Sequence, residues 1–232
     1  DFEIPQDWDG REVFISFDGV DSFFYLWING QYVGFSKNSR NTANFNITPY
    51  LQKGKNTVAA EVYRSSDGSF LEAQDMFRLP GIFRTVALYS VPKVHFRDLV
   101  ATPDLDATYT DGSLTVNAEI RNLDKKAIKD YKVYYSLYAN KLYSDENTLV
   151  DGFLSPVIDK IAPNETGSVQ TVLKVKAPNK WSAEFPYRYT LVAELKDKKN
   201  RTVEMVSTIV GFRKVEIKDT PASEDEFGLA GR

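Results

Sequence analysis

One connection in this chain gathers most of the side chains that could do chemistry. Residues 67–84 join two strand-like runs, 57–63 and 85–89. This connection is much longer than an ordinary hairpin loop. Long ordered loops on a β scaffold are where binding and catalytic residues concentrate. The connection holds two carboxylates, an amide, two arginines and three phenylalanines: Glu72, Asp75, Gln74, Arg78, Arg84, Phe70, Phe77 and Phe83. We therefore expect a functional site here.

Two carboxylates in one loop could in principle form the acid and the nucleophile of a hydrolase. A retaining glycosidase needs two carboxyl groups about 5 to 5.5 Å apart, one of them with a raised pKa. A single loop is a poor device for holding Glu72 and Asp75 at that separation. We therefore predict that no catalytic residue lies on this chain, and that Glu72 and Gln74 are structural. Arg78 and Arg84 could pair with the carboxylates, but the favoured interpretation is that they pin the loop to its scaffold.

Other candidate chemistry is sparse. The chain has no cysteine, which excludes disulfides, thiolate zinc sites and cysteine nucleophiles. His95 is the only histidine, so neither a Ser-His-Asp array nor a metal site can be proposed around it. No cofactor is predicted for the chain itself. A sugar-stacking platform could be imagined from Trp8, Trp27 and Trp181, but Trp27 is expected in the core and Trp181 at a sandwich edge.

Length and composition bound the remaining classes of function. The 232 residues suit two domains of roughly 100 residues each, and 13% aromatic content favours strands over helices. The net charge of −3, with acids and bases interspersed, predicts no nucleic-acid or anionic-membrane partner. No stretch reaches the roughly 18 to 20 apolar residues that a membrane-spanning helix needs. The absence of cysteine leaves the compartment open.

Alternating apolar residues predict strands along the first half of the chain. Val13, Ile15 and Phe17 share one face of a strand, whereas residues 23–28 are apolar on both faces, as a strand buried on both sides would be. Asn29-Gly30 supplies the two positive-φ positions of a type I′ hairpin turn. Residues 48–51, with Thr48 and Pro49, predict one short helical turn.

The second half alternates more regularly and shows no helical stretch. Short strands separated by turn signals are typical of a sandwich of about seven strands. The Cys-Trp-Cys hallmark of antibody domains is missing, so only the architecture is immunoglobulin-like. The predicted join lies near residues 90–93, where Pro92 interrupts the strand. The inward-facing sets are 114–120, 131–137, 169–175, 189–195 and 203–209, each taken at alternate positions.

The loop and four further segments resemble one known family. Residues 67–84 are similar to the "DGSyLEdQDmwR-sGIfR" signature of glycoside hydrolase family 2, found in a non-catalytic domain of its β-galactosidases. The spelling Glu-x-Gln-Asp resembles β-galactosidases more than β-glucuronidases or β-mannosidases. The other matching segments cover nearly the whole chain in the same order: 17–34 with Ser39-Arg40, 45–56, 180–191 and 210–215.

The resemblance implies an all-β fold of two sandwiches. A truncated jelly-roll β-sandwich, a domain of the sugar-binding type whose N-terminal part is missing, is expected over residues 1–93. An immunoglobulin-like β-sandwich follows over residues 94–218. Residues 219–232 are expected to form a linker towards an absent catalytic barrel. The chain begins on Asp1 inside a strand pattern and is interpreted as a fragment.

The resemblance also implies a function for the whole protein. The family member would be a retaining β-galactosidase, hydrolysing terminal β-galactosides in carbohydrate catabolism, with its two catalytic glutamates on the later barrel. The fragment alone is then expected to be inactive and to support the active site with one loop. Its partners would be the galactoside substrate, through the full enzyme, and the barrel of the same polypeptide. The family is compatible with a homo-oligomer. The compartment is left open between the cytoplasm and the periplasm of a bacterium.

Asp75 is the residue to which the resemblance gives a role. It matches the last Asp of the family's "DQD" triplet, which contacts a galactose hydroxyl and helps to bind sodium in the active site. The first Asp of that triplet is replaced by Ala73. Substrate binding and sodium ligation are therefore expected of Asp75 in the full enzyme, which would use sodium and magnesium. The alternative is a free-standing carbohydrate-binding or adhesive tandem of sandwiches, because such folds host both functions.

Overall fold

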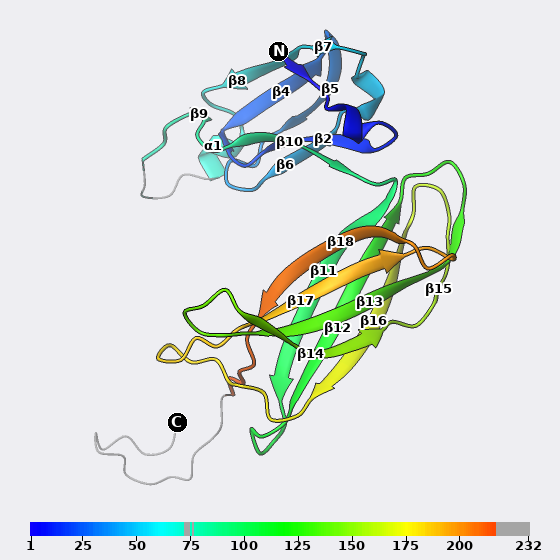
Figure 1. Ribbon diagram of the computed structural model, residues 1–232. Helices are drawn as coiled ribbons and strands as arrows, with labels where there is room; N and C mark the ends of the chain where they lie inside the picture. The colour runs from blue at the N-terminus through cyan, green and yellow to red at the C-terminus, as the bar shows by residue number, and fades with distance from the viewer. Residues whose placement is uncertain (72–74, 76, 217–232) are drawn as a thin grey trace. The chain divides into compact units, whose positions relative to one another are not determined.

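The computed structural model describes residues 1–71, 75 and 77–216 (Figure 1). The chain divides into two compact units. Unit 1 comprises Asp1–His95 and Asn122–Lys126, and unit 2 comprises Phe96–Arg121 and the described residues from Ala127 onward. Almost every regular element is a β-strand, which confirms the all-β fold class. Within the described residues, no helix is long and apolar enough to cross a membrane.

Unit 1 is a β-sandwich of the jelly-roll type, assembled from antiparallel strands. One sheet has the order β10-β2-β6 and the other the order β5-β4-β8. Two short ribbons, β1-β7 and β3-β9, flank them. The bounds are β1 Phe2–Glu3, β2 Glu12–Phe17, β3 Val20–Asp21, β4 Phe23–Ile28, β5 Gln31–Ser36, β6 Ala43–Asn46, β7 Lys55–Asn56, β8 Val58–Tyr63, β9 Gly81–Ile82 and β10 Val86–Val91.

The core of unit 1 lies between its two larger sheets. Alternate residues of β2 and β4 point at each other because side chains on a strand alternate between faces. The rings of Phe17 and Phe24 meet with centroids 4.7 Å apart. The side chains that form this core are at most 4% exposed: Val13, Ile15, Phe17, Val20, Phe24, Leu26, Ile28 and Ile47. The predicted inward face of β2 is thus confirmed.

The opposite face of β4 differs from the expectation. Phe23, Tyr25 and Trp27 are only partly buried, so the described residues do not fully cover that side of the sheet. The prediction that this strand is buried on both faces was wrong, and so was the assignment of Trp27 to the core. A run of apolar residues indicates that both faces can be covered, but it does not say that this chain covers both.

The predicted turns of unit 1 are present. Asn29 and Gly30 have φ values of 50° and 76°, and they connect β4 to β5, so the type I′ hairpin is confirmed. The predicted helical turn is the 3₁₀ turn η2 (Thr48–Tyr50), with Pro49 at its start. Thr48 Oγ1 accepts the backbone N–H of Val13 at 2.8 Å, which ties this turn to β2. A second 3₁₀ turn, η1, spans Gln6–Trp8.

Unit 2 is the immunoglobulin-like β-sandwich. One sheet has the order β11-β12-β16, and the other the order β14-β13-β17-β18, with β15 also paired to β13. These strands run from green to orange in Figure 1. The bounds are β11 Val94–Leu105, β12 Gly112–Asn122, β13 Ile128–Asn140, β14 Asn147–Leu154, β15 Ile158–Ile161, β16 Thr166–Val175, β17 Tyr189–Lys196 and β18 Thr202–Val210.

The core of unit 2 follows the predicted alternation in most strands. Leu114, Val116, Ala118 and Ile120 of β12 are all fully buried. Strand β18 is the exception, because Met205 and Ile209 are 60% and 56% exposed and its other face turns inward. A strand at the edge of a sheet can carry apolar residues outward, so alternation alone did not fix which of its faces is buried. The other fully buried members are Val133, Tyr135, Leu137, Leu191, Ala193 and Leu195.

Candidate functional site

The loop predicted to carry function begins in a tight local network. The backbone N–H of Ser66 donates to Ser69 Oγ at 2.9 Å, and the backbone N–H of Ser69 donates to the Ser66 carbonyl at 3.1 Å. Ser22 Oγ donates to Ser66 Oγ at 3.0 Å and so joins the start of the loop to the residue after β3. One turn of helix, α1 (Gly68–Leu71), follows. These bonds hold the start of the loop against the sandwich.

Asp67 adds an ion pair to this network. Its carboxylate lies 3.0 Å from Lys37 Nζ, at the end of β5, and it also accepts the backbone N–H of Gly68 at 2.9 Å. The hydrogen bond from Lys37, followed by that from Gly68, holds the pKa of the Asp67 carboxyl below its usual value. Both side chains are largely exposed, so the pair orients the loop more than it stabilises the fold.

The end of the loop is clamped to β3. Strand β9 pairs with β3 in antiparallel register, Val20 opposite Ile82, and the Phe83 N–H donates to the Gly19 carbonyl at 3.3 Å. Two guanidinium groups lie near the ring of Phe83, that of Arg40 at 5.4 Å and that of Arg84 at 5.2 Å from its centroid. A Cβ at Gly19 would lie 2.7 Å from the Phe83 ring and 2.9 Å from Arg84 Cδ, so a side chain there would displace these two groups.

The two arginines of the loop bind backbone carbonyls. Arg84 donates to the carbonyls of Asp18 and Arg40, at 3.3 and 3.0 Å. Arg78 donates to the carbonyl of Ser69 at 2.9 Å, across the loop. Arg84 therefore pins the loop to the sandwich, as the sequence favoured, and Arg78 ties the loop to itself. Within the described part of the loop, neither forms an ion pair with Asp75.

Asp75 lies in the middle of this loop, between its two pinned ends. It is exposed, and no hydrogen bond or ion pair joins its carboxylate to another described residue. Phe77, two residues later, is 92% exposed. The arrangement offers one acceptor carboxylate to whatever faces the loop, on a connection that is clamped at both ends. Glu72 and Gln74 lie outside the described residues, so the distance between the two carboxylates is not defined.

A cavity of about 430 Å³ adjoins the loop. It brings together three guanidinium groups and one carboxylate, that of Asp21, which is only 9% exposed and accepts a hydrogen bond from Ser39 Oγ at 3.4 Å. The excess of positive charge suits a carboxylate or another acceptor. The residues that line the cavity are Asp21, Arg40, Arg64, Ser65, Ser69, Arg78 and Pro80.

Sequence reasoning assigned no role to most of the residues that line this cavity. Ser39-Arg40 and Asp21 lie within segments that resemble the family, which is the one signal that could have singled them out. They are separated from Arg78 by 38 to 57 positions in the chain, and no local pattern joins residues that far apart.

The described residues do not make up a cation site by themselves. Sodium and magnesium, as hard cations, take several oxygen ligands. Among the residues that the structure describes, no group of three or more His, Cys, Asp or Glu side chains converges on one point. Asp75 brings a single carboxylate, so any further ligands would have to come from elsewhere. His95 is buried, with Nδ1 2.9 Å from the Pro92 carbonyl, which fits a structural role.

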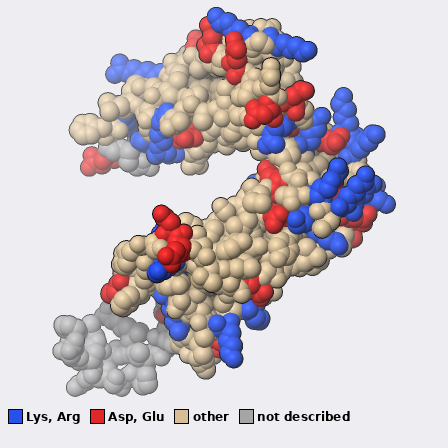
Figure 2. Space-filling model, in the orientation of Figure 1, with Lys and Arg blue, Asp and Glu red and all other residues tan. Residues whose placement is uncertain are grey.

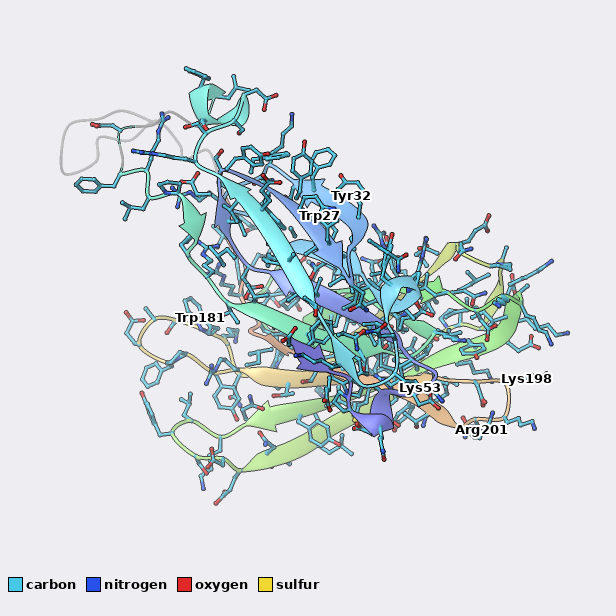
Figure 3. The ribbon with its side chains drawn as sticks, turned by 90° about the horizontal axis from the view of Figure 1, so that it is seen from above. Trp27, Tyr32, Lys53, Trp181, Lys198 and Arg201 are labelled. Atoms are coloured by element: carbon cyan, nitrogen blue, oxygen red, sulfur yellow. The ribbon has the colours of Figure 1, made fainter. Side chains whose placement is uncertain are left out.

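The tryptophans do not act as one platform. Trp8 lines a hollow with the first residues of unit 1, whereas Trp27 lies on the outer face of β4 beside Tyr32 (Figure 3). Trp181 belongs to unit 2, where the guanidinium of Arg213 lies 4.9 Å from its ring centroid.

Acidic and basic side chains lie next to one another on the face of each unit that Figure 2 shows.

Comparison with known proteins matches both units. A β-galactosidase of Priestia megaterium is 43% identical over 218 residues, which cover 94% of this chain and 20% of that protein. A β-galactosidase of Photobacterium profundum is 43% identical over 209 residues, covering 88% of this chain and 19% of that protein. The chain therefore spans about a fifth of the length of the curated relatives that it matches.

A solved structure and two family descriptions agree with this match. The crystal structure of a Bacteroides uniformis β-glucuronidase shares the fold with a TM-score of 0.80 at 22% identity, covering 92% of this chain and 26% of that one. Residues 1–92 match the family described as "Glycosyl hydrolases family 2, sugar binding domain". Residues 94–213 match the family described as "Glycosyl hydrolases family 2". Since these two matches together span nearly all of the described residues, the chain belongs to glycosyl hydrolase family 2.

Proposed function

We propose that this chain is the non-catalytic N-terminal part of a retaining β-galactosidase, which hydrolyses terminal β-galactosides in carbohydrate catabolism. The observation that supports this most is the loop 67–84. It is clamped at both ends to unit 1 and leaves Asp75 exposed, without a partner among the described residues. The names of the matched relatives support a galactoside as the substrate.

In this proposal the chain completes an active site that it does not contain. The two catalytic glutamates lie on a barrel of the same polypeptide, outside this chain. Asp75 accepts a hydrogen bond from a galactose hydroxyl and contributes one ligand to a sodium ion. Such a bond to a charged group is worth about 1.5 to 3 kcal/mol. The clamp at Gly19, Phe83 and Arg84 positions that carboxylate, because a displacement of about 1 Å can lose much of the gain from orientation.

A free-standing carbohydrate-binding or adhesive tandem is the rival. The family match favours the enzyme, because it extends through both units and continues in relatives about five times as long. A rival that bound galactose through the loop would require a complete sugar site around Asp75. Around Asp75 the described residues supply one exposed carboxylate and no enclosed pocket that includes it.

The isolated chain distinguishes the two. We expect the purified 232-residue chain to show no turnover of a chromogenic β-galactoside, because a (β/α)₈ barrel takes about 250 residues and strands already occupy this chain. Turnover that co-purifies with the chain and is lost in Glu72→Gln would contradict the proposal. Calorimetric titration with galactose should give weak or undetectable binding, since one or two contacts do not offset the cost of association. A micromolar dissociation constant for galactose would support the rival.

A further inference from the structure

The outer face of the sheet β5-β4-β8 is paved with aromatic rings. Phe23, Tyr25 and Trp27 of β4 all point outward, because their positions alternate with the buried core residues of the same strand. Figure 3 shows Trp27 and Tyr32 side by side. Tyr32, Phe35 and Tyr63, from the neighbouring strands, are 50%, 54% and 41% exposed. We call these six residues the aromatic face.

The six rings form one connected surface. Tyr25 lies at its centre, with centroid distances of 5.8 Å to Trp27, 5.9 Å to Tyr63 and 6.1 Å to Tyr32. Phe23 closes the other end, 5.7 Å from Phe35 and 5.6 Å from Tyr63. Rings that already pack against one another lose little freedom when a ligand arrives. The surface is therefore pre-organised for binding.

Polar groups stand at the rim of this surface. The ion pair of Lys37 and Asp67 lines the same hollow as four of the rings, and that hollow has a volume of about 470 Å³. On the β8 side the Tyr63 hydroxyl donates to Glu61 at 3.1 Å. The charged groups on this face are thus paired with neighbours. They are one cation, Lys37, and two carboxylates, Asp67 and Glu61. Such a rim disfavours nucleic acid and offers hydrogen bonds to an uncharged ligand.

These features fit a particular kind of ligand. An exposed apolar patch with a polar rim indicates a binding surface, and the exposed face of an antiparallel sheet is ordinarily polar. Sugar rings have an apolar C–H face and a girdle of hydroxyl groups, which match the rings and the rim. We propose that the aromatic face binds a β-linked oligosaccharide of hexopyranose units, at a site that adjoins the start of the loop 67–84 but that Asp75 does not line.

Titration of the 232-residue chain with β-1,4-galactotetraose and with cellotetraose tests this proposal. Calorimetry measures the affinity, and saturation-transfer NMR identifies the sugar ring protons that touch the protein. We expect at least one tetrasaccharide to bind and the double variant Tyr32→Ala/Phe35→Ala to bind about tenfold more weakly or not at all. The core of unit 1 lies on the other face of β4, so circular dichroism and the melting temperature should show that the variant folds.

Tyr89→Ala is the matched control. Tyr89 is 37% exposed on the other sheet, where it stacks on Phe14 at 5.3 Å, and its replacement should leave oligosaccharide binding unchanged. Asp75→Ala should also leave it unchanged, which separates this proposal from the active-site role of Asp75. Failure of both tetrasaccharides to bind the wild-type chain would overturn the proposal. Binding that survives in the folded double variant would overturn it too, as would a dimer through this face that binds no sugar.

Discussion

Two buried tyrosines of unit 2 differ in the hydrogen bonding of their hydroxyl groups. Tyr135 is fully buried, and its hydroxyl makes no hydrogen bond of good geometry in the described part of the chain, although the Thr171 hydroxyl, also without a well-formed bond, lies near it. The hydroxyl of Tyr189, 3% exposed, accepts the backbone N–H of Asn179 at 2.8 Å. Removing an unpaired buried hydroxyl is nearly neutral or stabilising, whereas removing a bonded one costs about 1 kcal/mol. We expect denaturant unfolding to show Tyr135→Phe as stable as the wild type or more so, and Tyr189→Phe as less stable.

The same residue predicts a loss of stability at alkaline pH. Burial raises the pKa of Tyr135 to about 12, from an ordinary value of 10.0. Above pH 10 the unfolded chain therefore loses this proton before the folded chain does, and the free energy of unfolding falls as the pH rises from about 10 to about 12. In Tyr135→Phe the free energy of unfolding should therefore decrease less over this pH range than in the wild type. Equal slopes for wild type and variant between these pH values would show that Tyr135 does not ionise differently in the two states.

At the scale of elements, the clamp between β3 and β9 determines where the loop is held. In Gly19→Ala the new methyl would lie 2.7 Å from the Phe83 ring and 2.9 Å from Arg84 Cδ, so the two side chains that hold the end of the loop must shift. Overpacking of this kind costs about 1 to 3 kcal/mol. We expect faster tryptic cleavage at Arg78 than in the wild type. The matched control is Gly68→Ala, where the nearest atom is 3.6 Å away. Identical cleavage of both variants would show that Gly19 does not hold the loop.

The elements also show how far sequence reasoning reached. The hairpin at Asn29-Gly30 and the inward face of β12 depend on local backbone chemistry and on a period of two, so both could be predicted. The outer face of β4 could not, because a run of apolar residues does not say what covers it. The cavity beside Asp21 could not either, since long-range strand pairing brings its residues together. Asp75 was singled out by resemblance alone, and its role in the active site stays a prediction.

For the whole molecule, the proposed active site is shared between this chain and the rest of a longer polypeptide. The chain spans about a fifth of its curated relatives, and each unit has a core of its own. Such a piece can fold, hold one loop in place and still have no activity. The activity should therefore depend on Asp75 far more than the stability of the fold does.

The most direct test replaces Asp75 by Ala in the full-length protein and measures kcat/KM for a β-galactoside, with and without sodium, beside the melting temperature. The exposed Asp159→Ala is the control. We expect Asp75→Ala to lower kcat/KM roughly ten- to hundredfold, the loss of one hydrogen bond to a charged group, and to abolish any sodium dependence. Its stability should stay within about 0.5 kcal/mol of the wild type. A folded Asp75→Ala protein with wild-type kcat/KM would contradict the account, because no residue of this chain would then reach the active site.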